Sequence, residues 1–140
     1  MPTLERAIEI SAKAHTGQID KAGQPYILHP LRVMMAVTGT DEKIVAVLHD
    51  VVEDTSVTLA DLSDEGFAKT VIAAVFAITK TERESRLDAA KRVVLNPIAR
   101  AVKLADLTDN MDLKRIALPS EKDLARMEEY KQVREILIKG

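Results

Sequence analysis

Cysteine is absent from this chain of 140 residues, and aromatic residues make up only 3% of it. The absence of cysteine excludes disulfide bonds, zinc–thiolate sites and thiol nucleophiles. Because aromatic rings are scarce, the core must be built from Leu, Ile, Val, Ala and Met. Glycine and proline number five each, few enough to permit long uninterrupted helices.

Long apolar runs and an excess of one charge are also missing. No run of about 18 apolar residues is present, and the first six residues do not resemble the start of a signal peptide. We therefore expect a cytoplasmic protein with no membrane partner. The 20 basic and 22 acidic residues give a net charge of −2, which provides no electrostatic reason to expect nucleic-acid binding. Nothing in the composition selects an oligomeric state.

The hydrophobic pattern predicts one all-α domain over residues 1–140, with six to eight helices. The 46% hydrophobic and 30% charged fractions are typical of a soluble globular protein, and the length is that of one ordinary domain. No segment alternates with period 2, and no repeat or linker is present. We expect helices over 4–14, 30–37, 41–53, 67–79, 86–95, 97–112 and 121–138, with a capping box at Thr58 opening a further short one.

The last predicted helix has one apolar and one charged side. Its core stripe is expected to consist of Leu124, Met127, Tyr130, Val133, Ile136 and Leu137. The acidic and basic residues that alternate from 121 to 134 predict a solvated face.

Residues 47–54 place one imidazole and three carboxylates inside a run that is otherwise apolar. On a continuous helix, residues four apart share a face, which puts His49 above Glu53. Asp50 lies above Asp54 in the same way. Because an unpaired buried charge is costly, and a cation would remove that cost, this stretch predicts a metal site on a buried helix.

Two further residues can complete such a site. His29 stands at a junction between a loop and a helix, where its side chain can be aimed inward, and Asp106 lies four residues before Asn110 on one helical face. Mixed nitrogen and oxygen ligands suit Mn, Fe(II), Zn, Co or Ni better than Ca or Mg. The predicted ligand set is His29, His49, Asp50 and Asp106.

Five motifs occur in order between residues 14 and 111. They are AHTGQ at 14–18, GQPYILHP at 23–30, LHDVVEDT at 48–55, KLAD at 103–106 and NM at 110–111. In this order they resemble the HD phosphohydrolase superfamily, and more narrowly the hydrolase domain of Rel/Spo-type alarmone enzymes and the stand-alone small alarmone hydrolases. A His-Asp pair alone would carry no such weight.

The resemblance implies a helical HD domain that hydrolyses the 3′-pyrophosphate of ppGpp or pppGpp, giving GDP or GTP and pyrophosphate. It implies that His29, His49, Asp50 and Asp106 hold one divalent ion, usually manganese. It also makes Glu53 and Asp54 the pair that orients and deprotonates the attacking water.

Four residues are candidate substrate contacts. The resemblance implies that Asn110 contacts the substrate near the ribose, that Lys21 flanks the purine, and that Tyr26 lies in the same pocket-forming segment. Lys103 lies near the face of Asp106, where it can neutralise an acid, touch phosphate or simply extend into solvent. His15 is expected to be structural and to pack the loop over 15–25 through its ring nitrogens.

The chain departs from the family pattern at several positions. Asp20 replaces the first residue of an Arg-Lys pair, and Leu107 and Asp112 stand where basic residues are frequent. Fewer cations mean a weaker hold on a highly charged nucleotide. Three alternatives therefore stay open: hydrolysis of another phosphorylated nucleotide such as an adenine alarmone or NADPH, a nucleotide-binding module without turnover, and oxidative di-iron chemistry. The last needs more ligands than three histidines offer.

Overall fold

The computed structural model describes residues 2–112 and 118–140, and these residues form helices connected by turns and loops. In that part of the chain the only β-pairing is an isolated bridge between Ile19 and Pro25. The prediction of an all-α fold is confirmed. Among the described residues, eight helices are longer than a single turn, and α4 is one turn. The helices are α1 (Leu4–Ala14), α2 (Leu28–Met35), α3 (Thr40–Leu48), α4 (Val51–Asp54), α5 (Leu59–Asp64), α6 (Lys69–Ile78), α7 (Arg86–Val93), α8 (Pro97–Asn110) and α9 (Glu121–Lys139).

Side-chain caps set several of the helix starts. The side chain of Asn96 accepts a hydrogen bond from the Ala99 N–H, and Pro97 occupies the first position of α8, where its missing N–H costs nothing. Thr58 and Asp61 form the predicted capping box at the start of α5.

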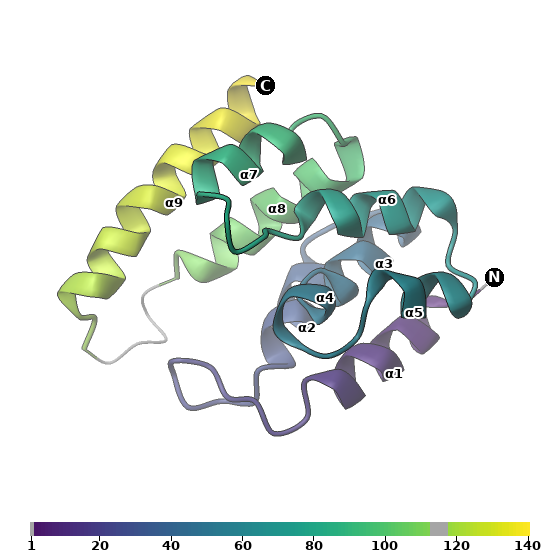
Figure 1. Ribbon diagram of the computed structural model, residues 1–140. Coiled ribbons are helices and arrows are strands. Elements are labelled where there is room, and N and C mark those ends of the chain that lie inside the picture. The colour runs from purple at the N-terminus through teal and green to yellow at the C-terminus, as the bar shows by residue number, and fades with distance from the viewer. Residues whose placement is uncertain (1, 113–117) are drawn as a thin grey trace.

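Helix α3 is the centre of the fold. It contacts α1, α2, α6 and α8, and its residues 44–48 are buried. Figure 1 shows α1 and α9 on opposite sides of the molecule, with α3 between them. The core is aliphatic, as the scarcity of aromatic residues predicted, and the fully buried leucines contribute about 2 kcal/mol each. These leucines are Leu48, Leu62, Leu107 and Leu137.

The prediction of one continuous helix over 41–53 is wrong. Helix α3 ends at Leu48 and α4 begins at Val51, so that His49 and Asp50 form the turn between them. The reason is a competing hydrogen bond. The Ala46 carbonyl accepts from both the backbone N–H and the ring Nδ1 of His49, and a side chain that bonds to the backbone in this way interrupts the helical ladder.

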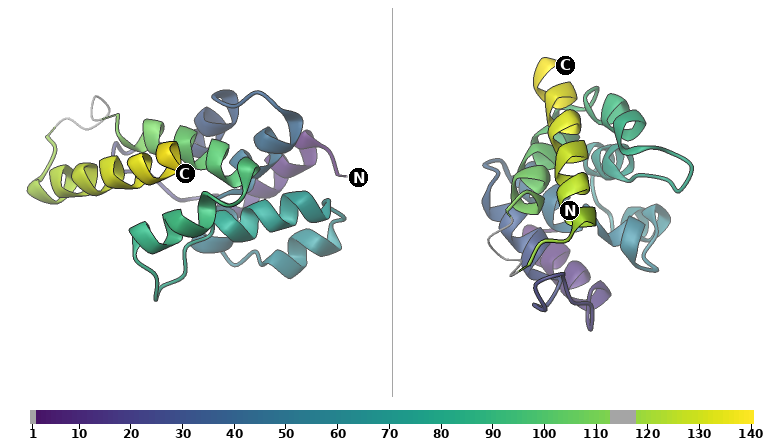
Figure 2. Two further views of the ribbon diagram at one scale, coloured as in Figure 1. Left: turned by 90° about the horizontal axis from the view of Figure 1, so that it is seen from above. Right: turned by 90° about the vertical axis from the view of Figure 1, so that its left-hand side faces the viewer.

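Helix α9 packs only in part. Its Val133 and Leu137 are buried against the core, but Leu124 is 53% exposed, which contradicts its assignment to the core stripe. The first turns of α9 extend past the end of α7, as two views show (Figures 1 and 2). Within residues 2–112 and 118–140, every helix is too short or too polar to traverse a lipid bilayer.

Candidate metal centre

Three separate elements bring four predicted side chains together. His29 comes from the first turn of α2, His49 and Asp50 from the turn after α3, and Asp106 from α8. Ligand atoms of His29, His49 and Asp50 all lie within 4.8 Å of one another. Asp106 Oδ1 lies 2.9 Å from His29 Nε2 and 3.3 Å from His49 Nε2. The described residues therefore contain a His–Asp cluster that could hold a metal ion.

The nitrogen Nε2 of His49 provides a test of whether a metal fits. His49 donates its Nδ1 hydrogen to the Ala46 carbonyl, so Nε2 is the ring atom left to bind a proton or, in the neutral ring, to offer its lone pair to a metal. This buried atom makes no hydrogen bond within the described part of the chain, although it lies 3.1 Å from Asp50 Oδ2 and 3.3 Å from Asp106 Oδ1. A bare lone pair facing two carboxylates is unfavourable, so this position calls for a cation, which is a proton in the metal-free protein and a metal ion when one binds. The residues present thus fit a divalent metal ion.

A second carboxylate fixes the orientation of His29. Asp109 Oδ2 lies 2.6 Å from His29 Nδ1, and Arg32 donates to both oxygens of Asp109, at 2.7 and 3.1 Å. Such a carboxylate beyond a histidine sets the ring's tautomer and raises its basicity as a ligand. Sequence reasoning missed both residues. Their signal was spacing, since Arg32 and Asp109 each follow a predicted ligand by three positions on the same helix.

Without a metal, the carboxylates of the cluster favour protonation of its two histidines. Burial lowers the pKa of both histidines, but the carboxylates of Asp106 and Asp109 outweigh it and leave the pKa of His29 raised. Asp50 and Asp106 raise the pKa of His49 well above its ordinary value in the same way. Burial opposes ionisation of Asp50, yet the His49 ring lowers its pKa to about 2.

Three candidate substrate-contact residues form hydrogen bonds with carboxylates of the cluster. The Tyr26 hydroxyl donates to Asp50 Oδ2, and burial, followed by the charge of Asp50, raises the pKa of Tyr26. Lys103 Nζ donates to Asp106 Oδ2 at 2.8 Å, and Asn110 Nδ2 donates to Asp106 Oδ1 at 3.1 Å. Of the three roles considered for Lys103, neutralising an acid is the one the structure contains.

Glu53 and Asp54 form the exposed rim of the cluster. Oxygens of Asp50, Glu53 and Asp54 lie within 4.8 Å of one another, and Glu53 Oε1 accepts from the Lys80 N–H at 2.9 Å. Partial burial, together with the charges of Asp50 and Glu53, raises the pKa of Asp54 to about 6. A carboxylate with a pKa near neutrality is well suited to accept a proton.

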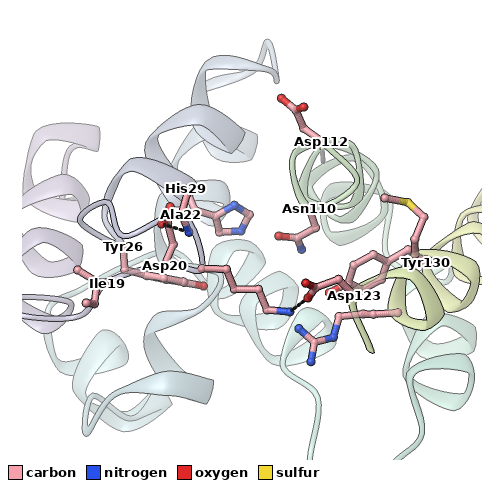
Figure 3. Close-up of a pocket in the computed structure, with 12 residues that line it drawn as sticks. Ile19, Asp20, Ala22, Tyr26, His29, Asn110, Asp112, Asp123 and Tyr130 are labelled. Atoms are coloured by element: carbon pink, nitrogen blue, oxygen red, sulfur yellow. Dashed lines mark hydrogen bonds and ion pairs between the residues drawn. The ribbon is translucent and has the colours of Figure 1, made fainter. Parts of the chain in front are cut away.

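A cavity of about 280 Å³ opens beside the cluster, between the loop over 15–25 and helix α9 (Figure 3). His29 and Asn110 form its border with the His–Asp cluster, and Tyr26 lines its loop side. Lys21, predicted to flank a purine, lines it too but is paired with Asp123 of α9 at 2.6 Å. The other lining residues are Ile19, Asp20, Ala22, Asp112, Arg126, Met127 and Tyr130.

Helix α9 therefore supplies site residues that the sequence did not reveal. Asp123 and Arg126 were predicted to lie on a solvated face, and Tyr130 to lie in the core, but all three line this cavity. No periodic signal could have found them, because the face that α9 turns to the site depends on long-range packing. Tyr130 also lines a second cavity of about 150 Å³, which His49 and Asp50 of the cluster line too. Its charged residues are His49, Asp50, Glu53, Lys80, Arg86 and Lys103.

Comparison with known proteins agrees with this arrangement. The family model described as "HD domain" matches residues 7–133. A "Probable GTP pyrophosphokinase" of Mycobacterium leprae is 36% identical over 93% of this chain and 18% of its own length. A "Guanosine-3′,5′-bis(diphosphate) 3′-pyrophosphohydrolase" of Aquifex aeolicus is 32% identical over 77% of this chain and 17% of its own length. The chain thus spans under a fifth of the length of these curated relatives.

A solved structure shares the fold. It is described as "A metazoan ortholog of SpoT hydrolyzes ppGpp and plays a role in starvation responses", and it superposes with a TM-score of 0.78 at 22% identity. The match covers 98% of this chain and 87% of the other. The match to the family model covers most of the chain and includes every residue of the His–Asp cluster, and the chain therefore belongs to the HD domain family.

Proposed function

We propose that this chain is a metal-dependent hydrolase that removes the 3′-pyrophosphate from ppGpp or pppGpp, and that residues 1–140 act as one HD-type domain. The observation that carries the proposal is the convergence of His29, His49, Asp50 and Asp106 at one point. The names of the relatives, which include 3′-pyrophosphohydrolases from several bacteria, support the choice of substrate.

His29, His49, Asp50 and Asp106 would hold one divalent ion, and manganese suits their mixture of nitrogen and oxygen donors. Such an ion acts as a Lewis acid, which makes hydroxide available near neutral pH and offsets phosphate charge. The protein prepares the histidines for this task. Asp109 and the Ala46 carbonyl each take an Nδ1 hydrogen, so that both Nε2 atoms can face the ion.

Asp54 and Glu53 would serve the attacking water. The water oxygen forms a bond to the phosphorus nearest the ribose, the bond from that phosphorus to O3′ breaks, and the 3′-oxygen takes up a proton from solvent as the nucleotide leaves. Asp54 accepts the proton that the water loses and afterwards returns it to solvent, a task that suits a rim carboxylate whose pKa is raised to about 6 in the metal-free protein by partial burial and the charges beside it. Glu53, held by the Lys80 N–H, orients the same water.

The larger cavity would receive the nucleoside and its 5′-phosphates. Lys21 and Arg126 provide cations there, and Tyr130 provides an aromatic face. The smaller cavity, with Lys80 and Lys103 among its lining residues, has the charge and size for a pyrophosphate group.

One observation favours a second candidate function. Lys21 is already paired with Asp123, and Asp20 and Asp112 add further acids to the cavity. The lining thus carries three acids (Asp20, Asp112 and Asp123) and two bases (Lys21 and Arg126), a net charge of −1 without His29. Such a cavity suits a substrate with fewer phosphate charges than pppGpp, as NADPH has. Hydrolysis of another phosphorylated nucleotide, NADPH or an adenine alarmone, is therefore the second candidate.

A nucleotide panel decides between the two. The manganese-loaded protein is incubated with ppGpp, pppGpp, pppApp and NADPH, and the products are identified by mass spectrometry. The proposal expects pyrophosphate with GDP or GTP. Release of pyrophosphate from pppApp alone, or of phosphate from NADPH alone, would establish the second candidate. Failure to turn over any of the four nucleotides would refute hydrolysis.

A further inference from the structure

The structure assigns a positioning role to His15 and Gln18, two residues of the loop after α1 that take no part in the site described above. We propose that they form a two-link tether that holds the Asp54 end of α4 in place beside the metal cluster. The role rests on the proposed function in one respect, since it concerns the carboxylate assigned to accept the water's proton.

The first link joins Gln18 to the end of α4. Gln18 Nε2 donates to the Asp54 carbonyl at 3.1 Å, across 36 positions of sequence. Helix α4 has only four residues, and the following residue, Thr55, is already extended. A single turn is too short to hold itself together, and its last carbonyls lack partners within the helix. Gln18 supplies a partner to one of them from outside.

The second link joins His15 to Gln18. His15 Nδ1 lies 2.8 Å from Gln18 Oε1. Because the Asp54 carbonyl can only accept, the amide nitrogen of Gln18 must face it, and the amide oxygen therefore faces His15. His15 Nδ1 is then the donor. A glutamine side chain loses considerable freedom when it is fixed, and the buried ring of His15, only 2% exposed, fixes it.

The spacing between the two residues has a backbone cause. Gly17 has a φ of +86°, which residues with side chains rarely adopt. The chain can therefore reverse here, and the Gln18 N–H donates to the His15 carbonyl at 3.1 Å. The reversal lets the His15 and Gln18 side chains meet, and Gln18 then reaches the Asp54 carbonyl.

His15 is also linked, through Tyr26, to Asp50 at the start of α4. Its ring packs against Tyr26, with centroids 4.9 Å apart, and the Tyr26 hydroxyl donates to Asp50. The buried His15 ring thus supports both Tyr26, which bonds to Asp50, and Gln18, which bonds to the Asp54 carbonyl. The consequence is a fixed placement of the proton-accepting carboxylate relative to the cluster.

Two matched pairs of variants test the tether in the full chain. Gln18→Glu keeps an oxygen for His15 but puts an oxygen against the Asp54 carbonyl, and His15→Ala removes the second link. Each is expected to lower kcat by about 10- to 100-fold, the effect of a small misplacement of a reacting group, while KM and manganese stoichiometry stay unchanged. His15→Asn is expected to restore most of kcat, because its amide nitrogen can donate where Nδ1 did. Gln132→Glu makes the same chemical change on the exposed surface of α9 and should have no effect.

A second readout is independent of turnover. Loss of the Gln18 bond should speed amide hydrogen exchange at Asp54 and Thr55 by about tenfold, and leave Val133 in the core unchanged. If the wild-type protein hydrolyses none of the nucleotides, the proposed function fails, and exchange alone decides the tether. Unchanged exchange at Asp54 and Thr55 would overturn the tether. So would an unchanged kcat in the Gln18→Glu variant of an active enzyme, or a folded His15→Asn variant as slow as His15→Ala.

Discussion

His29 and Asp109 lie 80 positions apart in sequence, yet their Nδ1 and Oδ2 atoms approach to 2.6 Å. Arg32 holds the same Asp109 carboxylate from the other side with two hydrogen bonds. The pair joins α2 to α8, so the contact that orients a proposed metal ligand is also one that holds the two helices together. This relationship leads to the first prediction.

Asp109→Asn should weaken manganese binding by about 10- to 100-fold, because a neutral amide no longer orients His29 or raises its basicity. Isothermal titration calorimetry with Mn²⁺ gives the dissociation constant directly. Asp64→Asn, on the exposed surface of α5, is the matched control. Equal affinities in the two variants would contradict the assigned role of Asp109.

Asp106→Ala should abolish metal retention and also destabilise the fold by about 1–3 kcal/mol, because it leaves Lys103 without its partner. The cost stays moderate because the Lys103 side chain keeps 27% of its exposure. Urea unfolding of the metal-free protein measures it. Adding Lys103→Met to this variant should restore stability but not metal binding. A double variant that is no more stable than Asp106→Ala alone would show that Lys103 does not depend on Asp106 for a partner.

Removal of the metal should make stability depend on pH in a defined direction. In the metal-free protein the pKa values of His29 and His49 are raised, so above pH 6.5 the folded state binds more protons than the unfolded state. Their stabilisation is complete below the unfolded pKa of about 6.5 and is lost as pH rises through the folded values. In the presence of a chelator, the free energy of unfolding should fall as the pH is raised from 6 to 9.

Manganese should reverse this trend, because metal and protons compete for the same Nε2 atoms. Calorimetry in two buffers of different ionisation enthalpy should reveal proton release on binding at pH 7, and affinity that increases with pH. Binding without any proton release would mean that the histidines are not ligands.

Asp123→Asn should improve nucleotide binding. The substitution frees Lys21, whose Nζ lies 2.6 Å from Asp123 Oδ1 at the border of the larger cavity. The amide oxygen of the new side chain can still cap α9. An exposed ion pair of this kind has a modest strength, and KM for the active nucleotide should fall about two- to fivefold. Glu121→Gln, in the same first turn of α9, controls for the change in net charge. A higher KM in Asp123→Asn would show that the pair assists the substrate instead.

The sequence predicted the helices well because their signals are local. Asn96 with Pro97, and Thr58 with Asp61, mark helix starts through contacts within one turn. The cluster of His29, His49, Asp50 and Asp106 could also be named, since histidines and acids within apolar segments are conspicuous and their motifs resemble a known family.

Features that depend on tertiary contacts could not be read in the same way. The break after Leu48 arises from the His49 ring bonding to its own backbone, which periodicity cannot reveal. The pairing of Lys21 with Asp123 joins residues 102 positions apart. The exposure of Leu124 depends on how α9 docks onto the rest of the chain, a property of the assembled fold.

The central claim, one cation shared by four side chains, is tested most directly by anomalous diffraction at the manganese edge from crystals grown with Mn²⁺. The account predicts a single strong peak within bonding distance of His29, His49, Asp50 and Asp106. The acids Asp50, Glu53 and Asp54 also lie close enough together to bind an ion. A peak bonded to those three and not to the histidines, or no peak at the cluster, would contradict it.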